Sequence, residues 1–275
     1  MSDRNDKYYT TGEFAKLCGI NKKTLFHYDD IGLLKPELVK QNGYRYYSVK
    51  QLEIFNVIAV LKELEMPLIQ IKEFLDCWTP ENTIELFNKE KLLVQQKIEN
   101  LKRIQEILDV KLSITKKGQE AKDKIFIEEQ EEESIILSEK VKETNDDYDV
   151  ETFVNHMKYC INVGVNYGYP MGSMISKENL VNGNFSKYDY YYMKSCNKIG
   201  KIKTDKKEKG IYVVGYSFGY YDKLFQLYER MVEFINHNNL LIDGYSYEDI
   251  LIDEVSSKNT DNFVVKVSIK CKYKN

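Results

Sequence analysis

The chain has 275 residues, of which 43% are hydrophobic and 30% charged, and its formal net charge is −3. This balance is typical of a soluble globular protein, and it excludes a uniformly basic protein that coats polyanions. Five scattered cysteines without a C-x-x-C motif argue against a disulfide framework. The polar N-terminus and the lack of a long apolar run argue against a secretion signal and a membrane span, so we expect a cytoplasmic protein.

The first 76 residues predict short helices with clear boundaries. Thr10 to Glu13 form a capping box that opens a first helix, and Gly19 ends it. Asn21 is a suitable N-cap for a second helix through Thr24 and Tyr28. Two short helices joined by a glycine-containing turn are typical of a helix-turn-helix motif.

A hairpin is predicted next, because Asn42-Gly43 lies between two extended runs. This two-stranded wing ends in the segment 44–47. Ser48 and Gln51 have the spacing of a second capping box, which opens an apolar helix. Met66-Pro67 ends that helix, and Pro67 then lies in the first turn of a short helix to about Asp76.

Thr79-Pro80 opens a long helix that we expect to end near Lys117, with Gly118 as its C-terminal stop. Its apolar positions follow an interrupted heptad pattern. A helix of this length needs a partner, and a second copy of the chain is the simplest one. The alternative is a helix packed only on its own chain. The heptad positions are Phe87, Val94, Ile98, Leu101, Leu108 and Leu112.

From about residue 124 the pattern changes to strand, helix, strand, strand, and this order occurs twice. Two such units can join into one curved sheet, with helices on one side and a groove between the halves. The acidic run 128–133 (EEQEEE) is interpreted as a solvated strand edge or loop.

The N-terminal 76 residues resemble the MerR family of winged-helix transcription regulators, through YYTTGEFAKLCGINKKTL, HYDDIGLLKP, NGYRYYS and MPLIQIKEFLD. The C-terminal half is similar to the GyrI-like effector-binding domain of the family's multidrug-sensing branch, through its duplication and YEDILIDE. The resemblance implies an α+β protein with three parts. These are a winged helix-turn-helix domain at 1–78, an antiparallel coiled-coil dimerisation helix at 79–118, and an effector-binding domain at 122–275.

The resemblance also implies a function. We expect a homodimer that binds double-stranded promoter DNA, distorts it when a small lipophilic cation binds, and acts on RNA polymerase indirectly through the DNA. The alternative is a GyrI-like domain that hydrolyses or sequesters small molecules. Because no nucleophile triad or phosphate loop is evident, we do not expect an enzyme.

The second helix of a helix-turn-helix enters the major groove, and the wing contacts the adjacent backbone. The competing interpretation is that the lysines are ordinary surface charge. We expect DNA contacts from Thr10, Lys22, Lys23, Thr24, His27, Tyr28, Tyr44, Arg45 and Tyr46.

Two positions depart from the family pattern, which has arginine in place of Phe26 and tyrosine in place of His27. The missing arginine removes a phosphate or base contact, which predicts an altered operator sequence or affinity. The alternative is that Phe26 belongs to the core.

Glu248 is the main candidate in the C-terminal half. Strand alternation places it on one face with Ile250 and Ile252, and an acid on an apolar face requires a partner such as a bound cation. The alternative is that Glu248 faces solvent and Asp249 faces inward. By resemblance of position, the ligand-binding residues are Glu248, Ile250, Tyr167, Tyr169, Tyr191, Tyr216, Phe218, Tyr220 and Tyr221.

We expect no metal and no cofactor. Metal sensors of the family place a cysteine near the start of the long helix, where Cys77 lies, and further ligands after the helix. Residues 112–121 contain neither cysteine nor histidine. Cys77 is therefore interpreted as a small packed residue.

Overall fold

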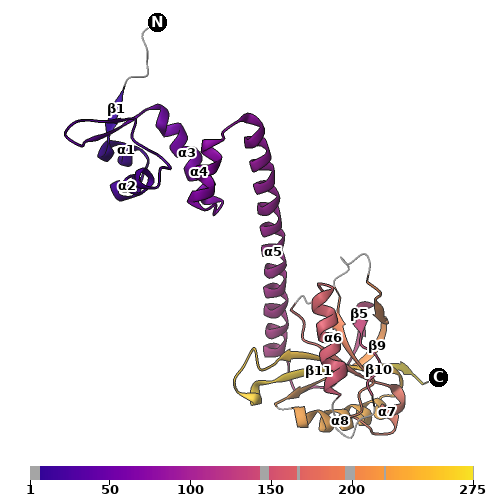
Figure 1. The fold of residues 1–275 in the computed structure, drawn as a ribbon. Coiled ribbons are helices and arrows are strands. Elements are labelled where there is room, and N and C mark those ends of the chain that lie inside the picture. The colour runs from indigo at the N-terminus through magenta and orange to yellow at the C-terminus, as the bar shows by residue number, and fades with distance from the viewer. Residues whose placement is uncertain (1–6, 143–148, 166–167, 196–201, 220, 275) are drawn as a thin grey trace. The chain divides into compact units, whose positions relative to one another are not determined.

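The computed structural model describes residues 7–142, 149–165, 168–195, 202–219 and 221–274. The chain divides into two compact units, Met1–Asn100 and Leu101–Asn275. The N-terminal unit contains β1 (Tyr8–Thr10), α1 (Thr11–Leu17), α2 (Lys22–Asp30), β2 (Leu38–Val39), β3 (Arg45–Ser48), α3 (Lys50–Glu63) and α4 (Leu68–Asp76) (Figure 1). The division between the units falls within α5 (Pro80–Glu120).

The helix-turn-helix forms as its caps predict. The Thr10 hydroxyl accepts from the Glu13 N–H at 3.4 Å, and the Glu13 carboxylate accepts from the Thr10 N–H at 2.9 Å, which completes the capping box. The Asn21 side chain caps α2 by accepting from the Thr24 N–H at 2.9 Å. Gly19 has a φ of +67° in the turn, a conformation that a residue with a Cβ rarely adopts. These features confirm the predicted motif.

The wing hairpin is also confirmed, because β2 and β3 pair antiparallel and Gly43 turns the chain with a φ of +78°. Its sheet has a third strand that the sequence analysis missed. Residues Tyr8 to Thr10 pair with Tyr46 to Ser48, which gives the order β1-β3-β2. The segment before the first helix therefore anchors that helix to the wing.

The predicted capping box at Ser48 forms only in half. The Gln51 side chain accepts from the Ser48 N–H at 3.1 Å, but the Ser48 hydroxyl is buried without a hydrogen-bond partner among the described residues. Val49 already has helical backbone angles, so the N-cap moves one residue past Ser48 and the serine hydroxyl cannot cap α3. At the next boundary Pro67 is the N-cap of α4, one residue before the predicted first turn.

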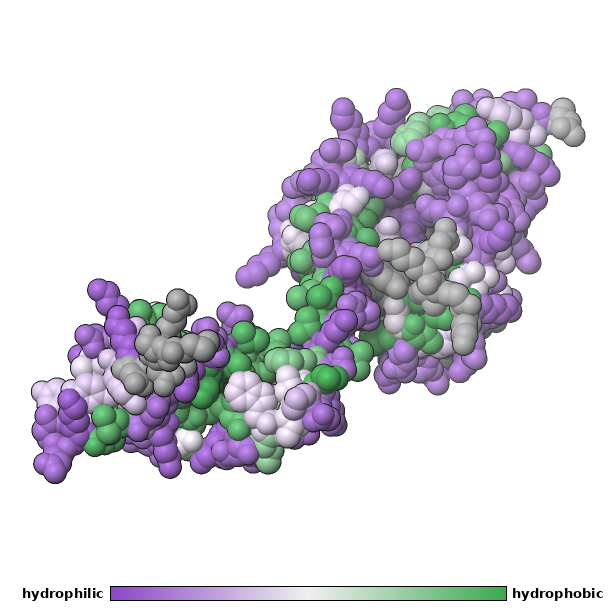
Figure 2. Space-filling model, turned by 90° about the horizontal axis from the view of Figure 1, so that it is seen from above, coloured by the Kyte–Doolittle hydropathy of each residue, from purple (hydrophilic) through white to green (hydrophobic). Residues whose placement is uncertain are grey.

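One apolar core holds the helices and the wing together. Phe14 stacks on Tyr47 with ring centres 4.8 Å apart, and this pair joins α1 to β3. Figure 2 shows green, apolar surface on this unit. The exposed apolar side chains of the unit include Ile69, Ile84 and Phe87. The fully buried members of the core are Phe14, Leu25, Tyr47, Ile58, Leu61 and Ile71.

The long helix continues past its predicted end. Gly118 is a buried residue inside α5 and does not stop it. A Cβ at Gly118 would lie 2.6 Å from Cγ1 of Ile252 and 3.2 Å from Cβ of Leu251. The glycine is therefore needed for its small size, because α5 packs against β10 at this point.

The C-terminal unit is built on one eight-stranded sheet of order β4-β9-β11-β10-β6-β7-β5-β8. Its central six strands form two halves that meet at β10 and β6, and each half is a strand-helix-strand-strand unit, which confirms the predicted duplication. The single strand predicted near 124–141 is two strands, β4 and β5, that lie far apart in the sheet. The elements are β4 (Phe126–Gln130), β5 (Glu133–Leu137), α6 (Val150–Asn162), β6 (Gly172–Ile175), α7 (Lys177–Val181), β7 (Tyr190–Lys194), β8 (Asp205–Lys207), β9 (Gly210–Phe218), α8 (Leu224–His237), β10 (Leu240–Ile252) and β11 (Val264–Tyr273).

The sheet has two distinct faces. Helices α6 and α8 pack on the first, which we call the helix face (Figure 1). The second, which we call the open face, carries the cluster that includes Tyr192, Tyr212 and Tyr247. Strand alternation assigns each residue of β10 to one face or the other. None of the helices in the described part of the chain is both long and apolar enough to cross a membrane.

Candidate functional site

The surface of α2 offers cations near the start of the helix. Lys22 and Lys23 are exposed in its first turn, and His27 is exposed one turn later. Thr24 is half-buried, and its hydroxyl donates to Asn21 at 3.2 Å. A helix N-terminus that carries exposed lysines attracts phosphate groups, so this surface suits a nucleic-acid backbone.

Two of the residues predicted to contact DNA, Tyr28 and Thr10, make contacts within the protein instead. Tyr28 is only 2% exposed and belongs to the core with Leu25, so its predicted contact with DNA is wrong. It points inward because it lies three residues after Leu25, on the same buried face of α2. Thr10 is half-buried, and its hydroxyl is used in the capping box with Glu13.

The wing places Arg45 next to Phe26, one of the two positions that depart from the family pattern. The Arg45 guanidinium pairs with Asp29 at 2.7 Å and lies over the Phe26 ring, 5.2 Å from its centre. Phe26 is 38% exposed, so the alternative that it is a core residue is wrong. It instead fixes the orientation of Arg45, because a guanidinium is attracted to the face of an aromatic ring.

The tyrosines of the wing remain accessible. Tyr44 is 61% exposed at the hairpin turn. Tyr46 is half-buried, and the Lys40 ammonium lies 4.6 Å from its ring centre. Lys22, Lys23 and His27 on α2 and Tyr44, Arg45 and Tyr46 on the wing therefore keep groups that can contact DNA.

Glu248 in β10 lies on the helix face, buried to 4% exposure beneath α8. The Tyr228 hydroxyl of α8 donates to its Oε1 at 2.9 Å, and Tyr188 also donates to it. Burial raises the pKa of Glu248 to about 7, although the two tyrosine hydrogen bonds act to lower it. Among the described residues no lysine or arginine pairs with this carboxylate. The alternative that Glu248 faces solvent is therefore wrong.

Aromatic rings surround this carboxyl group. Phe185 stacks on Tyr228 at a centre-to-centre distance of 5.2 Å, and Phe153 meets Tyr191 edge to face at 5.3 Å. Tyr191 lies on the same face as Glu248, since Ser173 of β6 pairs with both residues in register. A buried acid among ring faces is a suitable receptor for an organic cation.

The other ligand-binding candidates do not converge on Glu248. Ile250 shares its face, but Tyr216 and Tyr169 line a cavity on the open face. Phe218 packs near Leu251, and Tyr221 lies against Phe263 at 6.0 Å. Tyr167 and Tyr220 lie outside the described residues.

The open face carries a cavity of about 800 Å³ that is lined from both halves of the sheet. The sequence predicts a groove between the halves but not its charged lining. The end of α5 forms one wall of this cavity and the segment 126–133 another. β4 is an edge strand of the sheet, and Glu129, Glu131 and Glu132 are exposed, which agrees with the predicted solvated edge. Glu128 of the same run is half-buried and lines the cavity.

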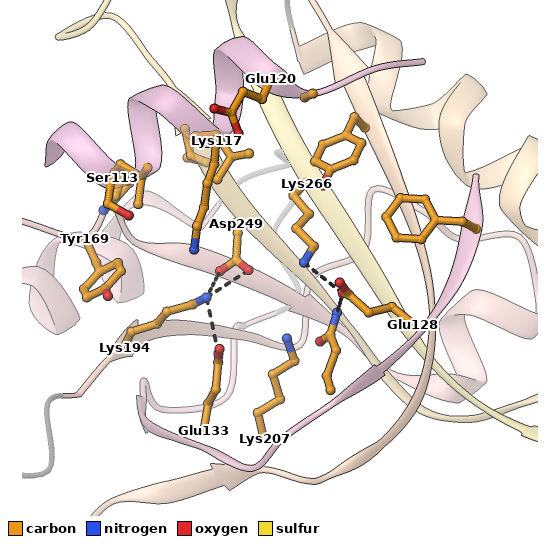
Figure 3. Close-up of a pocket in the computed structure, with 18 of the residues that line it drawn as sticks. Ser113, Lys117, Glu120, Glu128, Glu133, Tyr169, Lys194, Lys207, Asp249 and Lys266 are labelled. Atoms are coloured by element: carbon orange, nitrogen blue, oxygen red, sulfur yellow. Dashed lines mark hydrogen bonds and ion pairs between the residues drawn. The ribbon is translucent and has the colours of Figure 1, made fainter. Parts of the chain in front are cut away.

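Figure 3 shows charged side chains that point into this cavity from the sheet and from α5; the strands concerned are β4, β5, β7, β8, β10 and β11. The labelled lining residues are Ser113, Lys117, Glu120, Glu128, Glu133, Tyr169, Lys194, Lys207, Asp249 and Lys266.

Asp249 is the centre of this network. The Lys194 ammonium lies 3.0 Å from the Asp249 carboxylate and 3.3 Å from that of Glu133, and the Tyr192 hydroxyl donates to Asp249 at 2.7 Å. Burial acts to raise the pKa of Asp249, but Lys194 and Lys207 hold that pKa below its usual value. Asp249 therefore carries a negative charge that is matched by these lysines.

A sequence signal for this cavity existed. Lys266 and Asp249 are opposite each other in register, and each interrupts an apolar strand at an alternate position. Charged residues inside central strands indicate a polar, functional face.

Cys77 is exposed at the end of α4, so its interpretation as a packed residue is wrong. The described residues contain no group of three His, Cys, Asp or Glu side chains placed to hold a metal ion.

Comparisons with known proteins bear on both units. Residues 9–77 match the MerR HTH family of regulatory proteins. The multidrug-efflux transporter 2 regulator of Bacillus subtilis (strain 168) is 35% identical over 273 residues, which cover 99% of each chain. The multidrug-efflux transporter 1 regulator of the same strain is 29% identical over 137 residues, 49% of each chain. Among solved structures, EcmrR in its DNA complex covers 97% of this chain and 100% of that chain, with 19% identity and a TM-score of 0.40.

Proposed function

We propose a mechanism from the premise that the chain belongs to the MerR family of helix-turn-helix regulatory proteins. It is a DNA-binding transcription regulator that responds to a small effector. The finer features of this function are the DNA contacts, the dimer seam, the class of effector and the way the signal reaches the promoter.

For DNA, α2 enters the major groove of a promoter through Lys22, Lys23 and His27, and the wing contacts the adjacent backbone. The exposure of these side chains supports this assignment. Arg45 is oriented by Phe26 and Asp29, so it can reach a phosphate while it keeps its ion pair. In this arrangement Phe26 positions Arg45. The contact from Arg45 then replaces the one that the family's arginine makes from the position of Phe26.

The regulator acts as a homodimer joined along α5. The six heptad positions of α5 are between 37% and 63% exposed in the single chain, and an apolar seam of this length needs a partner helix. A two-fold dimer presents two reading helices at a fixed spacing, which suits a palindromic site.

The effector is a lipophilic cation that binds at Glu248. The observation that carries this assignment is the burial of the Glu248 carboxyl group, which is 4% exposed and accepts hydrogen bonds only from tyrosine hydroxyls among the described residues. Burial raises the pKa of this group to about 7. A cation among Tyr228, Tyr191 and Phe185 would ionise the carboxyl group and replace the missing positive partner. Because Glu248 is so little exposed, binding requires these rings to move.

Binding of the effector favours a form of the dimer that distorts the promoter, so RNA polymerase is engaged indirectly through the DNA. Such a shift requires the effector to bind one form more tightly than the other. The protein works in the cytoplasm, where its DNA lies, and senses the cation without turning it over.

The test is a footprint of the full-length protein on the DNA upstream of its own gene, with and without tetraphenylphosphonium. We expect protection at a palindrome in both cases and a new hypersensitive position at its centre when the cation is present. Triphenylphosphine oxide, a neutral compound with similar rings, is the control and should leave the pattern unchanged. Equal patterns with the two compounds would rule out a cation as the effector.

A further inference from the structure

Ser246 is a fully buried serine in β10 that the proposed function does not use. It lies two residues before Glu248, so strand alternation places both side chains on the helix face. In the strand register Ser246 is opposite Ile175 of β6 and Ile269 of β11, whose apolar side chains cannot accept a hydrogen bond from its hydroxyl. The acceptor for this hydroxyl comes instead from α8.

Tyr228 of α8 bridges Ser246 and Glu248. Its hydroxyl oxygen lies 2.9 Å from Oγ of Ser246 and 2.9 Å from Oε1 of Glu248. A phenol has one hydroxyl hydrogen, and an ionised carboxylate can only accept, so Tyr228 donates to Glu248. The Ser246 hydroxyl then donates to the Tyr228 oxygen. The three side chains form a chain of hydrogen bonds that runs in one direction, from Ser246 through Tyr228 to Glu248, and we call it the hydroxyl chain.

Packing holds the hydroxyl chain in place. Tyr228 is fully buried, and the ring of Phe185 stacks on it with 5.2 Å between the ring centres and 9° between the ring planes. A flip of the Tyr228 ring leaves its hydroxyl oxygen where it is, because that oxygen lies on the axis of rotation. Among the described residues, Tyr228 is the one side chain that hydrogen-bonds to the Ser246 hydroxyl.

The direction of the hydroxyl chain affects the charge on Glu248. A hydroxyl group that accepts a hydrogen bond becomes a stronger donor, because successive hydrogen bonds polarise one another. Burial and then the charge of Glu248 raise the pKa of Tyr228 well above its usual value, while the hydrogen bond from Ser246 acts to lower that pKa. A stronger donor at Tyr228 stabilises the ionised form of Glu248.

Two further tyrosines face Glu248 from other elements. Tyr188, in the segment between α7 and β7, donates a second hydrogen bond to the carboxylate, and Tyr191 of β7 is close enough to interact with its charge. No cation faces this carboxyl group within the described part of the chain. The hydroxyl chain and Tyr188 are therefore the groups that oppose the effect of burial on Glu248.

We propose that Ser246 is a positioning residue of the effector site, which acts through Tyr228 to hold Glu248 in the ionised form that a cation requires. Ser246 does not touch the effector. Its role in cation binding rests on the proposed function, whereas its effect on Glu248 is a property of the ligand-free protein. Ser246 thereby extends toward lower pH the range in which the site takes a lipophilic cation.

The titration of Glu248 in the full-length protein tests this role. With carbon-13 in the glutamate side chains, NMR follows the carboxyl signal of Glu248 as the pH changes, and Glu248→Gln identifies that signal by its loss. Ser246→Ala should raise the midpoint by about half a pH unit, because Tyr228 becomes a weaker donor. Tyr228→Phe removes the donor itself and should raise the midpoint by about one unit or more.

A double substitution separates the hydroxyl chain from a general effect on packing. In the Tyr228→Phe background, Ser246→Ala should shift the midpoint no further, because its influence passes through the phenol. Ser268→Ala is the matched control. Ser268 is also fully buried, in the neighbouring strand β11, but it lies opposite Tyr247 in register and therefore on the open face. Its substitution should leave the titration of Glu248 unchanged.

An unchanged midpoint in a folded Ser246→Ala variant would overturn the proposal. An equal shift with and without the Tyr228 hydroxyl would do the same. If Ser246→Ala does not fold, Ser246→Cys replaces it, since a thiol is of similar size but a weak donor, and the midpoint should rise by a smaller amount.

Titration with tetraphenylphosphonium then separates the role of Ser246 from the assignment of the effector. In Ser246→Ala the pH profile of cation binding should move with the midpoint of Glu248, so the affinity at pH 6 should fall about threefold. A midpoint that moves while the binding profile stays fixed would confirm the effect of Ser246 on Glu248 and overturn the assignment of the cation to Glu248.

Discussion

Glu248 and Asp249 are neighbours in β10, yet their carboxylates are buried on opposite faces of one sheet in opposite electrostatic settings. Glu248 faces tyrosine hydroxyls beneath α8, and its pKa rises to about 7. Asp249 faces Lys194 and Lys207, which hold its pKa below its usual value despite burial. Within the described part of the chain, one peptide bond thus separates an acid without a cationic partner from an acid that is ion-paired with Lys194.

The affinity for a lipophilic cation should depend on pH through Glu248. The carboxyl group must ionise to pair with the cation, so tetraphenylphosphonium should bind about tenfold more weakly at pH 6 than at pH 8, given a pKa of about 7. Glu248→Gln should bind weakly at both values. Fluorescence or calorimetric titration measures this, and a flat pH profile in the unsubstituted protein would contradict the assignment.

The same group should make folding stability depend on pH. Its folded-state pKa lies above the unfolded value of 4.5, so the folded state binds the proton more tightly. The contribution to stability is complete below pH 4.5 and is lost as the pH rises to about 7, by at most about 3 kcal/mol. Glu248→Gln should therefore narrow the difference in melting temperature between pH 5 and pH 8. An equal difference in both proteins would show that Glu248 titrates normally.

Lys23→Ala should weaken operator binding about equally for all sequences and reduce the salt slope of the binding constant by about one charge, because a phosphate contact is lost. Lys89→Ala is the matched control, since Lys89 is an exposed lysine on α5 outside the helix-turn-helix. Fluorescence anisotropy on labelled duplex at several salt concentrations gives both slopes. Similar losses in the two variants would indicate only a general charge effect.

Leu108→Lys should dissociate the dimer at micromolar concentration. Leu108 is 57% exposed in the single chain. A lysine at this position would bury one charge from each subunit in the dimer seam, so the cost of burying an unpaired charge arises twice. Sedimentation velocity measures the change, with Lys102→Gln as a polar control on the same helix. A Leu108→Lys variant that sediments like the unsubstituted protein would move the dimer seam to another face of α5.

Gly118→Ala should destabilise the C-terminal unit. Alanine favours a helix by about 1 kcal/mol, but its Cβ would lie 2.6 Å from Cγ1 of Ile252, and overpacking typically costs about 1–3 kcal/mol. We expect a net loss of about 1 kcal/mol in denaturant unfolding. Gln119→Ala, at an exposed neighbouring position, should be neutral or slightly stabilising, and a stabilised Gly118→Ala would show that β10 can move away.

The local sequence determined the helix-turn-helix, the wing hairpin and the doubled strand-helix-strand-strand pattern. These depend on caps, turn residues and hydrophobic period, which act between residues close in the chain: Thr10 with Glu13, Asn21 with Thr24, and Gly43 at its turn. The same alternation placed Glu248 on an apolar face, and that placement agrees with the structure.

The tertiary structure alone decided which side chains meet. Tyr28 is drawn into the core, Phe26 stays at the surface under Arg45, and Gly118 serves close packing, although each residue type is compatible with the opposite role. The charged cavity depends most strongly on the fold. Lys194, Lys207, Asp249 and Lys266 come from four strands that are distant in the chain, and only the strand order brings their charges within interacting distance. The strength of the interaction between two charges depends on their distance in space. The spacing of hydrophobic residues along the chain does not determine that distance.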